Sequence, residues 1–167
     1  MHTFQLFVYG LEKRRMPHHH FCRKAVKIED AVVSGRLYQL PPGYPALEVP
    51  RKSILWTGSR DFFKDAQEQD MENCDGNLAF EIHDGWTAVH GELVTFSDPE
   101  RDMPLIDKLY WHPFVFERHL VPAKSETGSV MTAWAYTVFN VPVAAPFLSE
   151  GVWPKNRKVK PVKINQD

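Results

Sequence analysis

Proline and glycine interrupt this chain from end to end and limit it to short secondary-structure elements. Thirteen prolines and nine glycines occur among its 167 residues. Because proline fixes φ and removes a hydrogen-bond donor, a bundle of long helices is excluded. The runs between these breaks are rich in β-branched and aromatic residues, a composition that predicts strands. These runs are residues 3–9, 31–40, 86–96, 114–121 and 130–139, and the polar segment 124–129 predicts a hairpin between the last two.

The predicted helices are few and short. Pro17 suits the first turn of a helix that places Cys22 on its inner face. A second helix is expected from Met103 to Tyr110, because Pro104 cannot lie deep inside a helix. Strands combined with short helices indicate an α+β fold.

Three further segments carry weaker patterns. Residues 41–50 (PPGYPALEVP) predict a stiff loop because of their prolines. Residues 51–85 contain the acidic, amide-rich stretch 65–77 and predict a short helix or a surface excursion rather than a second domain. Ser97 and Glu100 have the spacing of a capping box.

Length and charge set the broad class of protein. A chain of 167 residues suits one domain, which we expect over residues 1–150, followed by a basic C-terminal tail over residues 151–167. The net charge of −1 gives no global reason to expect nucleic-acid or membrane binding. No apolar run reaches the roughly 20 residues of a membrane span, and no secretion signal is visible. A cytoplasmic monomer or weak dimer is expected.

The tail allows two interpretations. It is either a solvated or loosely docked terminus, or a segment whose cations contact phosphate. The residues concerned are Lys155, Arg157, Lys158, Lys160 and Lys163.

Several familiar sites do not fit the pattern. Three adjacent histidines, His18 to His20, cannot easily converge on one ion, so neither a metal site nor a cofactor is expected. Cys22 and Cys74 match no metal spacing and suit free thiols, with a surface disulfide as the alternative. The chain has no nucleophile elbow, P-loop or G-x-G-x-x-G motif.

A set of short fragments occurs in a distinctive order between residues 4 and 139. They are Phe7–Gly10, Gly35–Tyr38 with Gly43–Leu47, Val89–Leu93, Leu105–Asp107, Phe116–Arg118 and Ala133–Tyr136. In this order they resemble the γ-glutamylcyclotransferase-like superfamily, which includes plant avirulence-induced proteins and small bacterial members.

The resemblance implies a mixed, barrel-like β-sheet with a few short outer helices around a small polar cavity. It also implies a γ-glutamyl ligand, whose α-amine attacks its own γ-carbonyl to form 5-oxoproline and release an amine. The loop after the first strand, here Tyr9, Gly10, Leu11 and Glu12, would supply main-chain donors to that ligand. In this family a glutamate at the end of the later helix accepts the proton of the α-ammonium.

Two departures from the family pattern fall at these positions. The family sequence Y-G-(T/S)-L is here Tyr9-Gly10-Leu11-Glu12, and the glutamate position is occupied by Tyr110. A phenol with a pKa near ~10 is a poor base at neutral pH. Loss of a positioned general base commonly costs ~10²–10⁴ in rate.

Other side chains could take part instead. Glu12 either points inward toward a ligand or outward to solvent, and Glu92 lies in a strand whose cavity face the sequence does not decide. Tyr44 and Tyr9 either line the pocket or are ordinary hydrogen-bonded aromatics. Two hypotheses follow: a cyclotransferase that uses Glu12 or Glu92, and a non-catalytic module that binds a small molecule.

Overall fold

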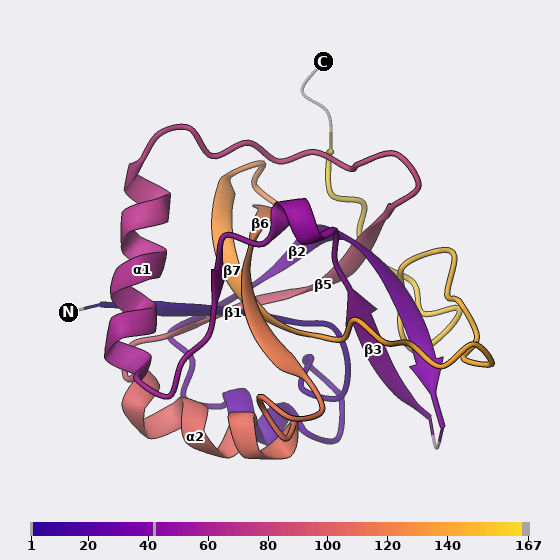
Figure 1. The fold of residues 1–167 in the computed structure, drawn as a ribbon, viewed down its shortest axis with the longest axis horizontal. Coiled ribbons are helices and arrows are strands. Elements are labelled where there is room, and N and C mark those ends of the chain that lie inside the picture. Colours follow the sequence, from indigo (N-terminus) through magenta and orange to yellow (C-terminus); the bar gives the residue numbers. More distant parts are fainter. Residues whose placement is uncertain (1, 42, 165–167) are drawn as a thin grey trace.

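The computed structural model describes residues 2–41 and 43–164 and confirms the α+β architecture (Figure 1). Five strands pair in the order β1 (Phe4–Val8), β5 (Thr87–Phe96), β2 (Lys27–Leu40), β6 (Glu117–Ser125) and β7 (Val130–Thr137). β7 pairs with β1 and closes the ring. That contact is parallel and the other four are antiparallel. The closed, mixed barrel confirms the predicted fold.

Two short strands extend the barrel, and one of them corrects a prediction. β4 (Trp56–Thr57) pairs with β6, and β3 (Tyr44–Glu48) pairs with β2. The stiff loop predicted over residues 41–50 is therefore wrong for residues 44–48. Pro45 lies opposite Gln39, whose N–H donates on the other side of β2 to the Pro146 carbonyl (2.9 Å). This pair exchanges no ladder hydrogen bond, so the missing donor of proline costs nothing here.

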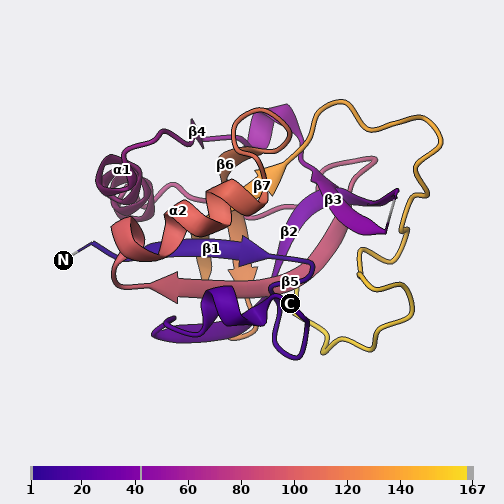
Figure 2. The same ribbon diagram turned by 90° about the horizontal axis from the view of Figure 1, so that it is seen from below.

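Two α-helices pack on the outside of the barrel, α1 (Phe62–Cys74) along the left edge and α2 (Pro99–Leu109) along the bottom in Figure 1 (Figures 1 and 2). α1 falls in the stretch where a short helix was one of two predictions. α2 begins four residues before the predicted start at Met103, and Asp98 rather than Ser97 caps it. Pro104 lies inside this helix, where its ring removes one main-chain hydrogen bond. Met103 and Ile106, both fully buried, anchor the helix on each side of it.

The helix predicted after Pro17 is reduced to a single 3-10 turn, His19–Cys22. A second such turn is Arg51–Ser53. Cys22 is buried as predicted, and burial raises the pKa of its thiol to about 12. A thiol in this state is a small core residue and not a nucleophile.

The core has two layers because strand residues alternate between faces. Phe7 packs inside the barrel with small residues such as Ala133 and Ala135. Its neighbours in β1 face the helices, where Phe4 stacks on Trp134 with centroids 5.8 Å apart. The small interior side chains allow five strands to close around the barrel axis.

The segment after β7 packs back onto the barrel. Phe147 forms a bridge to Tyr38, and Val152 and Trp153 are buried. Farther along, Val162 is 7% exposed and the Lys124 ammonium donates to the Ile164 carbonyl (2.7 Å). The tail is thus docked as far as residue 164. Within residues 2–41 and 43–164, no helix has the length and hydropathy that a membrane span requires.

Candidate functional site

A cavity of about 380 Å³ opens where the loop after β1 meets the C-terminal end of α2. α2 runs alongside β1 in the same direction, which brings the end of the helix to the end of the strand (Figure 2). The β2–β3 turn and the loop after α2 complete the wall. Most of the lining is apolar, more so than the small polar cavity that the resemblance implies. The polar side chains of the lining are Glu12, His18, Tyr44 and Tyr110.

The loop after β1 lies tightly against β3. The Gly10 carbonyl accepts from the Lys13 N–H (3.3 Å), which closes a turn. A Cβ added to Gly10 would lie 2.7 Å from Cγ of Pro45 and 3.8 Å from Oε2 of Glu12. Only glycine permits this approach, so Gly10 sets how far the loop projects into the cavity.

Glu12 is the one carboxylate in the lining, and the residue is only 2% exposed. Burial raises the pKa of Glu12 above its ordinary value, an effect that the Tyr110 hydroxyl and the Lys13 charge partly oppose. Its Oε2 atom is buried and has no hydrogen-bond partner among the described residues. A buried carboxylate oxygen without a partner is costly, and a ligand that donates to it would remove that cost.

His18 supplies a second buried polar atom without a partner. Its Nδ1 is buried and makes no hydrogen bond within residues 2–41 and 43–164. The next two imidazoles turn away, since Nδ1 of His19 bonds to the Glu12 carbonyl (2.9 Å) and Nδ1 of His20 to the Pro17 carbonyl (3.2 Å). The histidine run therefore places one imidazole, not three, at the cavity. Imidazole is the side chain best suited to transfer protons near neutral pH.

Tyr110 is held rigidly at the end of α2. Its ring stacks on Tyr136 with centroids 4.1 Å apart and packs edge-on against Phe116 at 5.1 Å. Burial, with the nearby Glu12 carboxylate as a smaller cause, raises the pKa of Tyr110 well above its ordinary value. The phenol therefore stays protonated and can donate a hydrogen bond, but it cannot act as a base at neutral pH.

Trp111 forms part of the rim. Its φ of 53° is in the left-handed region, and its N–H donates to the Lys108 carbonyl (3.2 Å) to end the helix. This conformation costs a bulky residue about 1–2 kcal/mol. Trp111 is 69% exposed, so this conformation leaves a large aromatic residue at the surface beside the opening.

The structure brings four of the predicted site residues to this cavity: Leu11, Glu12, Tyr44 and Tyr110. Gly10 is not part of the lining, but it lies next to two residues that are, Glu12 and Pro45. Tyr9 is buried in the barrel, where its hydroxyl donates to the Tyr136 carbonyl (2.7 Å). Glu92 lies outside this cavity, and both of its carboxylate oxygens accept from Arg14 (2.7 Å each).

Among the lining residues that were not predicted, His18 and Trp111 are the candidates for a functional role. The histidine run was interpreted against a metal site, and the position of His18 close after Glu12 in a polar loop was a usable signal that this interpretation left out. Trp111 gave no sequence signal, because its place on the rim depends on the left-handed conformation just beyond the helix.

Comparison with known proteins identifies the family. The family model described as gamma-glutamyl cyclotransferase, AIG2-like, matches residues 64–155. This match covers more than half of the chain, and the protein belongs to this family. It includes Tyr110 but begins after the β1 loop, so it does not reach Glu12. A search of curated protein sequences gave no match.

Solved structures share the fold at low sequence identity. An AIG2-like protein from Mus musculus is 16% identical with a TM-score of 0.52, and the similarity covers 99% of this chain and 100% of that one. YkqA from Bacillus subtilis is also 16% identical at a TM-score of 0.52, but this chain spans only 39% of its length while 90% of this chain is covered. PH0828 from Pyrococcus horikoshii is 13% identical at a TM-score of 0.50, with 90% and 89% covered.

Proposed function

We propose that this protein cyclises a γ-glutamyl compound to 5-oxoproline and that Glu12 is the proton acceptor. Family membership supports the reaction, and one observation supports the residue. Glu12 lines the same cavity as Tyr110, and its buried Oε2 has no hydrogen-bond partner among the described residues. In this proposal the carboxylate has moved from the helix end to the opposite wall.

In the reaction the attacking nitrogen loses two protons and the leaving nitrogen gains two. Glu12 removes a proton from the α-ammonium of the ligand, since only the free amine is a nucleophile. The amine nitrogen attacks the γ-carbonyl carbon and forms the lactam C–N bond. The original γ-amide C–N bond then breaks. The leaving nitrogen takes up the proton that Glu12 had accepted and the second proton that the new lactam nitrogen releases, and it departs as an ammonium. No other reactant is required.

The surrounding groups suit this role. The raised pKa of Glu12 makes it a stronger base than an ordinary carboxylate. The Tyr110 phenol, which stays protonated, would donate to the oxygen that gains charge in the transition state. His18, whose Nδ1 has no partner among the described residues, would relay one of these protons from Glu12 to the leaving nitrogen.

The test measures release of 5-oxoproline from a panel of γ-glutamyl amides and γ-glutamyl amino acids, with thermal shift in parallel. Glu12→Gln should lose about 10²–10⁴ in kcat, and His18→Gln a smaller factor. Glu100→Gln and His20→Gln are matched controls with exposed side chains away from the cavity, and they should retain wild-type rates. An unchanged kcat in Glu12→Gln would rule Glu12 out as the base.

The second candidate is a binding module without turnover, and Tyr110 is the observation that favours it. A phenol replaces the glutamate that the family uses as a base, and its raised pKa excludes the same role. This candidate predicts a thermal shift with a γ-glutamyl compound and no 5-oxoproline from any member of the panel. Product formation that depends on Glu12 would exclude it.

A further inference from the structure

A separate cavity of about 260 Å³ lies between residues 13–15, strand β5 and the C-terminal tail. The tail curves back toward the loop after β1 (Figure 2). The two cavities have no lining residue in common, although Glu12 and Lys13 are adjacent in the chain. Nothing in the proposed cyclisation uses this second cavity.

Positive charge is concentrated there in a chain whose net charge is −1. Among the described residues, the acidic residues of the lining are Asp30 and Glu92, and Arg14 binds both at 2.7 Å. The remaining basic side chains face the cavity without a carboxylate partner of their own among the described residues. The cations of the lining are Lys13, Arg14, Arg15, Arg157, Lys158 and Lys160.

Lys13 is the buried cation of the group, with the residue only 5% exposed. Its ammonium donates to the Trp153 carbonyl. Burial and, as a smaller cause, the charge of Arg157 lower the pKa of Lys13 to about 8, against the opposing charges of Glu92, Asp30 and Glu12. A buried ammonium beside a second cation is a group whose charged form an incoming anion would stabilise.

The two walls are held in place by specific contacts. The Arg157 guanidinium donates to the Arg14 carbonyl (3.3 Å) and to Sδ of Met16 (2.8 Å), which joins the tail to the loop. Each wall also contains one non-glycine residue in the left-handed region, Arg15 with φ 68° and Asn156 with φ 69°. The cations therefore lie on two segments that contact each other beside the same cavity.

We propose that this cavity binds a compact polyanion of the diphosphate class. Its volume suits a diphosphate group, and cations reach it from two segments. A nucleic-acid strand would instead require a track of cations along many nucleotides. The proposal does not depend on the cyclisation, because no γ-glutamyl ligand enters its test.

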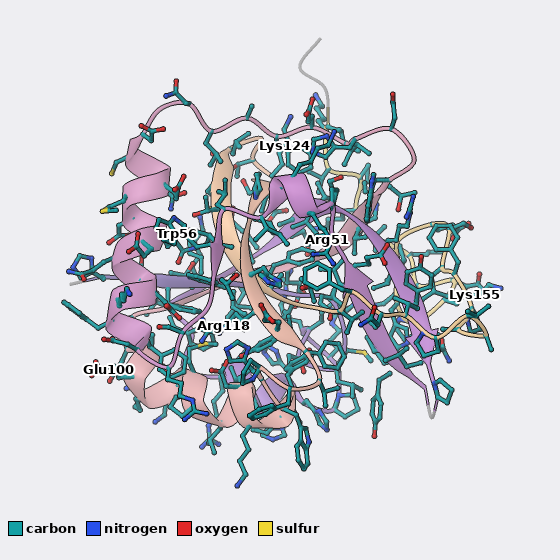
Figure 3. The ribbon with its side chains drawn as sticks, in the orientation of Figure 1. Arg51, Trp56, Glu100, Arg118, Lys124 and Lys155 are labelled. Carbon is teal, nitrogen blue, oxygen red and sulfur yellow. The ribbon has the colours of Figure 1, made fainter. Side chains whose placement is uncertain are left out.

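The test is calorimetric titration with inorganic pyrophosphate at low ionic strength, using two double variants with the same change in charge. Lys158→Ala/Lys160→Ala removes two cations of the lining and should weaken binding by about tenfold or more. Lys155→Ala/Lys163→Ala removes two exposed tail cations outside the lining, and Lys155 points away from the barrel (Figure 3). It should change the affinity by less than about threefold, the effect of diffuse charge alone.

Three results would overturn the proposal: no binding of pyrophosphate at millimolar concentration, an equal loss in both double variants, or affinity for a single-stranded oligonucleotide that rises with length and resists pyrophosphate. A second readout follows the Lys13 side chain by NMR. Saturation with sulfate, an anion that does not titrate in this range, should raise the pKa of Lys13 from about 8. An unchanged Lys13 titration at saturation would place the anion elsewhere and reject the site.

Discussion

Glu12 combines two properties that a structural residue rarely has together. It is a carboxylate in a tight loop, and its buried Oε2 has no partner among the described residues. Such a group destabilises the folded protein, because the charged form has lost its hydration without gaining equivalent bonds. The Glu12 carboxylate therefore lowers the free energy of unfolding, and a function in the cavity would explain its presence there.

This cost can be measured as a pH dependence. The pKa of Glu12 is raised by burial in the folded state, whereas an unfolded glutamate titrates near ~4.3. Between these two values the folded protein binds more protons, so its free energy of unfolding falls as the pH rises and levels off above the folded pKa. Glu12→Gln removes this loss. The variant should be more stable than wild type by about 1–3 kcal/mol at pH 8, and the difference should shrink toward pH 4.

The measurement is urea unfolding of both proteins across this pH range. Glu100→Gln is the control, since Glu100 is exposed in the first turn of α2, where a negative charge is favourable. Glu100→Gln should change the free energy of unfolding by only a few tenths of a kcal/mol. A constant difference between wild type and Glu12→Gln from pH 4 to pH 8 would show that Glu12 does not titrate as the structure requires.

At the scale of the elements, Arg118 connects the barrel to both helices. It lies on β6 and is fully buried (Figure 3). It donates to Asp65 of α1 (2.6 Å) and to both carboxylate oxygens of Asp107 of α2 (3.0 and 3.1 Å). Asp107 also accepts from the Tyr136 hydroxyl. Because Tyr136 in turn stacks on Tyr110, this network fixes the helix end at the cavity.

Arg118→Lys should therefore destabilise the protein by about 2–4 kcal/mol, since an ammonium cannot reproduce a bidentate pair and a third contact at once. The measurement is urea unfolding followed by tryptophan fluorescence. Arg101→Lys is the matched control, because Arg101 also forms a two-contact pair with Asp102 (2.7 Å each), but at the surface. It should change stability little. Equal effects in the two variants would show that the Arg118 network does not fix the helices.

The sequence predicted some elements well and others poorly, for physical reasons. The long strand over residues 87–96 was clear, because its branched residues lie between glycine and polar breaks. β3 was missed, because whether Pro45 is tolerated depends on which side of β2 the Gln39 N–H points. The early start of α2 was missed because Pro104 is tolerated only through tertiary burial of Met103 and Ile106. The direction of the Gln39 N–H and the burial of Met103 and Ile106 both depend on tertiary structure, so the local sequence of β3 or α2 does not reveal them.

At the scale of the whole molecule, the order of six fragments was sufficient to predict the barrel. The two walls of the cavity, the loop after β1 and the end of α2, were predicted in part. The β1 loop and Tyr110 are about one hundred positions apart, and the resemblance placed them together. Which side chains project into the space was not predictable. Glu12 points inward because Gly10 lies against Pro45, and Glu92 is held by Arg14 elsewhere.

The tail is where sequence and structure differ most at this scale, and the difference is testable. A basic terminus suggests solvation, yet Val162 is 7% exposed while Val159, three residues earlier, is 42% exposed. Burial of the two valine methyl groups stabilises a docked tail by about 1–2 kcal/mol. Val162→Ala should therefore lower Tm by about 2–8 °C, whereas Val159→Ala should leave it unchanged. Thermal unfolding of the two variants side by side decides the matter, because a loosely attached tail would make them indistinguishable. A drop confined to Val162→Ala would mean that the tail is part of the packed structure, and hence that the cations at 157–160 are held against the loop after β1.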